Sequence, residues 1–190
     1  LVLDMAVLEH NVQKMQAVAN RTGKNLRPHA KTHKCSELAK RQIEVGASGV
    51  CAAKVSEAEA LQKAGLSGIL ITGPVATPKK IKRLVDILVK DPSLMTVVDH
   101  RKSIALLDAE LRERGQSMDV LLDVDVGLHR TGVRPSNALE LADDILSRPS
   151  LRLRGIQAYA GQVQHIRSYD ARRTASLKCL GEAVSVIREL

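Results

Sequence analysis

Short apolar runs alternate with longer amphipathic segments along most of the chain. The runs lie at residues 25–31, 49–54, 68–72, 95–98, 119–126 and 151–160. Some, such as Gly68-Ile69-Leu70-Ile71 and Val120-Leu121-Leu122, are almost continuously apolar, which is typical of parallel strands buried on both faces. We therefore predict six strands, each followed by a helix, in a parallel sheet.

Capping signals and helical spacing set the expected helix boundaries. Asp4 can cap a first helix that carries Leu8, Val12 and Met15 on one side and ends at Gly23. Residues 1–3 form a strand-like stub before it. The later helices are expected at 36–45, from Ser56 with Glu59 completing a capping box, at 78–90, 100–114 and 135–147, and from Tyr169 to the end.

Six strand–helix units fit either an open doubly wound sheet or a (β/α)8 barrel. No Gly-x-Gly-x-x-Gly follows the first strand, which disfavours a dinucleotide-binding sheet. We expect one domain over residues 1–190, of the α/β class, forming a (β/α)8 barrel that is truncated after about six units.

Composition excludes few classes of function. The net charge of +8 arises from 29 basic and 21 acidic residues that are interleaved, so solvated helix faces explain it better than a nucleic-acid partner does. The aromatic side chains are Tyr159 and Tyr169, too few for stacking on single strands. Three cysteines without CxxC spacing and no apolar stretch of about 20 residues predict a cytoplasmic protein without a membrane segment.

Polar and reactive residues gather where the expected strands end. His29 and Lys31, Lys54, Thr72, Asp99, the segment 123–130 and Tyr159 all hold such positions. Barrel enzymes build their active sites at this edge. We therefore expect these residues to lie together.

Lys31 is the candidate nucleophile. Burial at a strand end and the neighbouring cations Arg27, His29 and Lys34 would favour the neutral amine that Schiff-base chemistry requires. The residues alone leave the alternative open that Lys31 lies in a solvated basic loop, since clustered basic residues are usually solvated.

Four segments resemble the D-threonine aldolase and D-serine dehydratase family of alanine-racemase-like, fold-type III pyridoxal phosphate (PLP) enzymes. They are Leu26 to Cys35 (LRPHAKTHKC), Asp123 to Val133 (DVDVGLHRTGV), Gly155 to His165 (GIQAYAGQVQH), and the opening residues 1–12. The resemblance covers essentially the whole chain. It implies a barrel that binds PLP as a Schiff base on Lys31.

The resemblance also implies roles for other residues. Arg130 would lie near the PLP ring, where a permanent cation can keep the pyridine nitrogen unprotonated, although an ion pair with Asp123 or Asp125 is the alternative. Tyr159 and Gln157 would contact the cofactor from one side of their strand. His29 would support Lys31, and His165 would act as a general base or contact the substrate, with a structural role as the alternative.

The implied activity is that of a lyase for D-β-hydroxy amino acids, which cleaves them to glycine and an aldehyde. β-Elimination of water from D-serine and amino-acid racemisation are the enzymatic alternatives, and a PLP-homeostasis protein is the non-enzymatic one. Ala160 replaces a histidine of the aldolases, which leaves the substrate open. A divalent metal is expected for the full-length family, with ligands outside this chain. We therefore expect this chain alone to lack full activity, and we leave a homodimer open.

Overall fold

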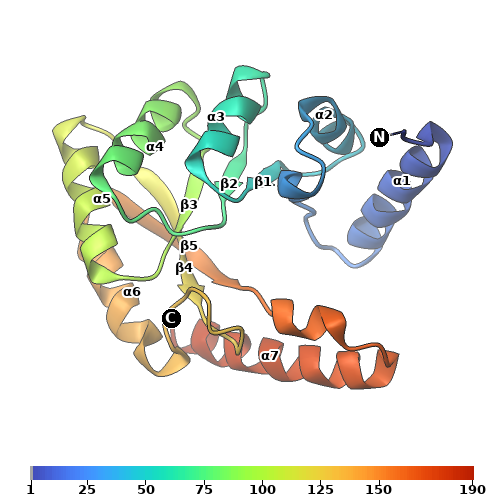
Figure 1. Cartoon of the computed structure of the whole chain (residues 1–190). Coiled ribbons are helices and arrows are strands. Elements are labelled where there is room, and N and C mark those ends of the chain that lie inside the picture. The colour runs from blue at the N-terminus through green and yellow to red at the C-terminus, as the bar shows by residue number, and fades with distance from the viewer. Residues whose placement is uncertain (1) are drawn as a thin grey trace.

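The computed structural model describes residues 2–190 and contains one five-stranded parallel sheet. The strands pair in sequence order and are β1 (Val50–Ala52), β2 (Ile69–Ile71), β3 (Met95–Val98), β4 (Met118–Val124) and β5 (Leu151–Ala158). The helices are α1 (Met5–Arg21), α2 (Ser36–Glu44), α3 (Val55–Lys63), α4 (Pro78–Lys90), α5 (Arg101–Glu113), α6 (Ala138–Leu146) and α7 (Tyr169–Glu189). They form an arc around the strands, with α1 and α7 at its two ends (Figure 1).

The two faces of the sheet bury different sets of side chains. Val50, Ile69, Ile71 and Leu122 point outward, into the core shared with the helices. The alternate residues form a smaller apolar layer on the inner face, made of Cys51, Leu70 and Val97 with Met95 and Leu121 packed against them. Burial on both faces explains why the strands are continuous apolar runs in the sequence.

A bulge at Gly155 changes which face of the sheet the following side chains of the last strand point to. Val120 pairs with Leu153, but two positions later Leu122 pairs with Ile156, so β5 contains one extra residue. Gly155 takes it up with φ +138°, a conformation that favours glycine. The inserted residue brings Gln157 opposite Asp123, on the inner face of the sheet.

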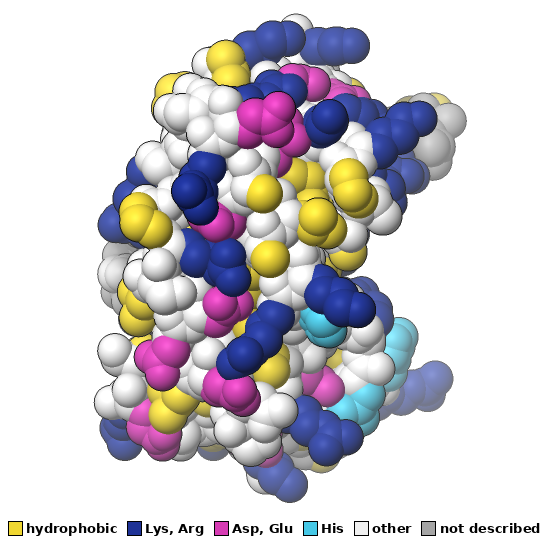
Figure 2. Space-filling model, turned by 90° about the vertical axis from the view of Figure 1, so that its left-hand side faces the viewer, with side chains coloured by type: hydrophobic (Ala, Val, Ile, Leu, Met, Phe, Trp, Pro, Cys, Tyr) yellow, Lys and Arg dark blue, Asp and Glu magenta, His cyan; other side chains and the backbone are white. Residues whose placement is uncertain are grey.

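Ion pairs tie neighbouring helices together on the outside. Arg83 of α4 binds Glu59 of α3 through two hydrogen bonds, and Arg114 binds Asp86 of α4 at 2.6 Å. Basic and acidic side chains are interspersed on the face shown in Figure 2, as the interleaved sequence predicts. No helix of residues 2–190 is long and apolar enough to cross a membrane.

The α/β class and the strand–helix alternation are confirmed, but two boundaries were wrong. The expected strand at 25–31 is an extended segment with a single bridge from His29 to Cys51, followed by the 3-10 turn η1 (Ala30–Thr32). Pro28 contributes a carbonyl to the Cys51 amide but has no N–H to donate in return, which limits pairing.

The second correction concerns the helix expected to start at Ser56. The cap position is Lys54, and Glu57 accepts the Ala53 amide at 2.8 Å. Glu59 therefore has no capping role and pairs with Arg83 instead. Of the expected stub at 1–3, Leu1 lies outside the described residues, and residues 2–4 belong to no strand.

Candidate active site

The inner face of the sheet carries polar residues directly beyond its apolar layer. Two positions after Leu70, Val97 and Leu121, respectively, the chain places Thr72, Asp99 and Asp123. Side chains alternate along a strand, so these three continue the inner face at the carboxyl ends of β2, β3 and β4. The inner face of the sheet is thus apolar along the strands and polar at their carboxyl ends.

A pocket of about 190 Å³ opens at this level. It is lined by residues from four separate segments of the chain, namely His29, Lys31, Thr72, Arg130, Gln157, Ala158 and Tyr159. Five of them are sequence-predicted site residues: His29, Lys31, Arg130, Gln157 and Tyr159. Five of the six predicted site residues therefore line one pocket.

Lys31 lies in the η1 turn, which the side chain of His29 holds in place. The backbone N–H of Lys31 donates to His29 Nδ1 at 3.2 Å, and His29 Nε2 lies 3.0 Å from the Thr72 hydroxyl oxygen. Burial lowers the pKa of His29, and the positive charge of Lys31 lowers it further. The Lys31 side chain itself is exposed, so its expected burial at the end of a strand was wrong.

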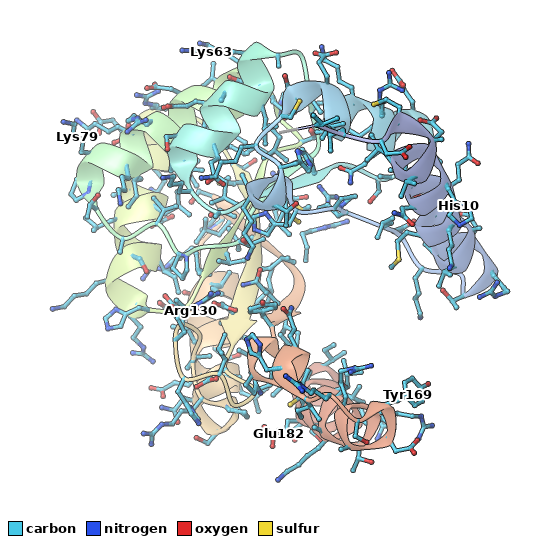
Figure 3. All side chains as sticks on the ribbon, turned by 45° about the vertical axis from the view of Figure 1, so that its right-hand side comes forward. His10, Lys63, Lys79, Arg130, Tyr169 and Glu182 are labelled. Atoms are coloured by element: carbon cyan, nitrogen blue, oxygen red, sulfur yellow. The ribbon has the colours of Figure 1, made fainter. Side chains whose placement is uncertain are left out.

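Arg130 is carried by a loop whose backbone is fixed by carboxylates. Asp125 accepts the backbone N–H groups of Gly127 and His129, at 3.0 and 2.9 Å, and Asp99 accepts that of Gly132 at 3.1 Å. Gly132 has φ +96°, and a Cβ there would lie 2.7 Å from the Asp125 nitrogen. The loop therefore needs glycine at this point, and its fixed backbone holds Arg130 beside the pocket, near the centre of the molecule (Figure 3).

Both cations of the pocket lie near the ring of Tyr159. Lys31 Nζ is 5.5 Å and Arg130 Cζ is 5.4 Å from the centre of its ring, both within cation–π range. Its hydroxyl accepts from Gln164 at 3.2 Å. Neither cation forms an ion pair among residues 2–190, so the predicted alternative of an Arg130–aspartate pair was wrong. The pocket thus presents two unpaired positive charges and an aromatic ring.

Asp123 is the buried acid beneath the pocket. Its side chain is 3% exposed and accepts a hydrogen bond from Gln157 Nε2 at 2.8 Å, while Oδ2 has no partner among the described residues. Burial raises the pKa of this carboxyl and Asp99 adds to the effect, against the opposing influence of Gln157, Thr131 and Arg130. Gln157 also donates to the Thr72 carbonyl at 3.1 Å, so it connects β5 to the chain after β2.

His165 stands apart from the other predicted residues. It is exposed at the end of η3 (Gly161–His165) and does not line the pocket, so a catalytic role for it stays a prediction without geometric support. Residues 2–190 hold no group of three or more His, Cys, Asp or Glu side chains arranged to bind a metal.

Thr72 and Asp123 are functional candidates to which sequence reasoning gave no role of their own. Both stand at the end of an apolar strand run, and that position was their available signal. Their partners could not be predicted, because the His29–Thr72 and Asp123–Gln157 contacts join residues 43 and 34 positions apart.

Known proteins resemble the chain in sequence and in structure. The D-threonine aldolase of Arthrobacter sp is 40% identical over 173 residues, which are 90% of this chain and 45% of that protein. The 3-hydroxy-D-aspartate aldolase of Paracoccus denitrificans (strain Pd 1222) is 36% identical over 192 residues, covering 98% of this chain and 50% of that protein. The crystal structure of D-threonine aldolase from Filomicrobium marinum superposes with a TM-score of 0.94 at 33% identity, over 99% of this chain and 52% of that one.

The chain thus spans about half the length of these relatives. The sequence pattern of the family described as "Alanine racemase, N-terminal domain" matches residues 3–189, which is nearly the whole chain. With this match and with relatives above 30% identity, the chain belongs to the alanine racemase N-terminal domain family.

Proposed function

We propose that this chain is the PLP-binding part of a lyase for D-β-hydroxy amino acids, and that Lys31 holds the cofactor as a Schiff base. The observation that carries the proposal is the convergence of the Lys31 amine, the Arg130 guanidinium and the Tyr159 ring on one pocket. The aldolases that are 36–40% identical over most of the chain support the reaction class.

The residues of the pocket fit PLP in charge and shape. PLP is a planar, anionic aldehyde, and the pocket offers a primary amine, a second cation and an aromatic face. Neither Lys31 nor Arg130 has a carboxylate partner among the described residues, so an anion bound there would gain attraction without breaking an ion pair. When bound, PLP supplies an electron sink for bonds at the substrate Cα.

Each residue then has a task that its contacts support. Lys31 would hold the cofactor through its side-chain amine. Arg130 would supply a permanent positive charge to the bound cofactor. Tyr159 would cover part of the pocket and limit the access of water. His29 fixes the turn that carries Lys31 through its bond to the Lys31 N–H, and Gln157 anchors the inner face through Thr72 and Asp123.

The barrel expected from the sequence is part of the same proposal. The sheet runs in sequential parallel order, as in a barrel, and its five strands make an open sheet within the described residues. We propose that it forms part of a (β/α)8 barrel in the complete protein, where the metal of the family would be bound by residues outside this chain.

Cofactor binding is tested by absorbance. PLP added to the chain should give the band of a protein Schiff base, and the band should be absent in Lys31→Ala. Lys34→Ala is the matched control, since Lys34 is an exposed lysine of the same basic segment that does not line this pocket. Equal loss of the band in both variants would contradict the assignment to Lys31.

The reaction is tested on the product of the complete gene, loaded with PLP and a divalent metal. Release of glycine from D-threonine, with L-threonine inert, supports the aldolase. A 2-oxo acid and ammonia as products would assign the dehydratase instead, and interconversion of enantiomers without cleavage would assign a racemase.

A further inference from the structure

The Thr72 hydroxyl lies between the imidazole of His29 and the carbonyl of Ala52. Its oxygen is 3.0 Å from His29 Nε2 and 3.2 Å from the Ala52 oxygen. On its other side, the imidazole accepts the Lys31 backbone N–H at Nδ1, at 3.2 Å. A row of three hydrogen bonds therefore runs from Lys31 through His29 and Thr72 to Ala52.

The direction of this row is fixed at both ends. A backbone N–H can only donate, so His29 Nδ1 must be the unprotonated nitrogen. A backbone carbonyl can only accept, so the Thr72 hydroxyl donates to Ala52 and accepts from His29. In a neutral imidazole the single proton must then be on Nε2, which is the nitrogen that faces Thr72.

The reverse arrangement would break the row. If Thr72 donated to Nε2, the proton would be on Nδ1 and would face the Lys31 N–H. Two donors would then point at each other, and the Ala52 carbonyl would lose its hydroxyl donor. One orientation therefore satisfies every donor and acceptor in the row.

We propose that Thr72 is a positioning residue for Lys31, acting through His29. Because its hydroxyl donates to the Ala52 carbonyl, it accepts from His29 and so favours the Nε2–H tautomer. That tautomer leaves Nδ1 free to hold the Lys31 N–H in the turn that directs the lysine to the pocket. The backbone carbonyl of Thr72 also accepts from Gln157 at 3.1 Å, so one residue ties the lysine turn to the last strand. The assignment rests on the proposed function in one respect, that Lys31 carries the cofactor.

Thr96 provides a matched control for a purely structural role. It is a threonine on the neighbouring strand β3, 1% exposed, and its hydroxyl has no hydrogen-bond partner among the described residues. Valine keeps the shape of threonine and removes the hydroxyl at either position. Thr96→Val therefore changes a buried hydroxyl of the same sheet without touching the row.

The first measurement reads the tautomer without cofactor. The chain is labelled with ¹⁵N-histidine, and the His29 ring signals are assigned by comparison with His29→Gln among the six histidines. We expect the Nε2–H pattern in the unchanged chain, in Thr72→Ser and in Thr96→Val, and a mixture of tautomers in Thr72→Val. An Nδ1–H tautomer or a charged imidazole at neutral pH in the unchanged chain overturns the proposal, whether or not any variant folds.

The second measurement is the PLP affinity of Lys31. Losing one hydrogen bond worth about 1 kcal/mol weakens binding about fivefold, so we expect that loss in Thr72→Val, with rescue in Thr72→Ser and no change in Thr96→Val. An equal loss in Thr72→Val and Thr96→Val would point to packing and overturn the proposal. If Lys31 binds no PLP while the tautomer follows the Thr72 hydroxyl, the proposed function fails and the hydrogen-bonded row stands.

Discussion

Gly155 provides a sharp test of how the last strand presents its residues to the pocket. Its φ of +138° lies where L side chains rarely occur, and a Cβ added there would meet no atom within 4 Å. Gly155→Ala therefore introduces backbone strain without a steric clash. Strain of this kind costs about 1–3 kcal/mol, and the reduced freedom of the unfolded chain returns about 0.4–1 kcal/mol.

With the middle of each range, the expected net loss of unfolding free energy is about 1.3 kcal/mol. Gly181→Ala is the matched control, because Gly181 lies inside α7 and a Cβ there also meets no atom within 4 Å. The same chemical change should stabilise the helix by up to about 1 kcal/mol. Urea unfolding of the two variants measures both shifts of the midpoint.

The urea midpoints of the two variants should shift in opposite directions, while PLP loading stays normal in both. An unchanged or higher midpoint for Gly155→Ala would refute the reasoning, since the bulge would then not require glycine.

Three further predictions concern the pocket and the core. Burial raises the pKa of Asp123, so the ionisation of this carboxyl opposes folding. Asp123→Asn should therefore unfold at a higher urea concentration than the unchanged chain at pH 7. This advantage should disappear as the pH falls below the ordinary carboxyl range, which a pH series of urea midpoints checks. Tyr159→Leu removes the ring near Lys31 and Arg130 and should weaken PLP binding several-fold, because each exposed cation–π contact contributes about 0.5–1 kcal/mol. Tyr159→Phe keeps the ring and should retain the PLP affinity. A spectroscopic titration of each variant with PLP measures the difference. Leu84→Ala empties a fully buried position of α4 and should cost about 2–5 kcal/mol in unfolding free energy, with PLP affinity retained in the folded protein.

The hydrophobic pattern of the sequence predicted most of the strands of the sheet. Five of the six predicted strands are present in the structure, because parallel strands buried on both faces must be apolar throughout. The ends of these runs also placed Thr72, Asp99 and Asp123 at one edge of the sheet. The site could therefore be located before its contacts were known.

The failed predictions depended on contacts that no local pattern contains. The segment at 25–31 reads as a strand, yet Pro28 lacks an N–H and the His29 side chain bends the chain into a turn after a single bridge. Ser56 reads as a helix cap, but Glu57 takes the amide of Ala53 instead. In both places a side chain competes for backbone hydrogen bonds, and the outcome depends on where that side chain lies in space.

Gln157 lines the pocket for a reason that the sequence supplies only in part. Simple alternation puts Gln157 and Tyr159 on one side of the strand but cannot say which side faces the pocket. The extra residue at Gly155 decides that, since without it Ile156 would pair with Asp123. A glycine inside a strand was the available signal for the bulge.

Borohydride reduction tests the central claim most directly. PLP is added to the chain, the Schiff base is reduced to a stable amine, and the labelled peptide is identified by mass spectrometry. The account predicts the label on Lys31, within the segment Leu26 to Cys35. A label on Lys34, Lys54 or any other lysine, with Lys31 unmodified, would contradict it.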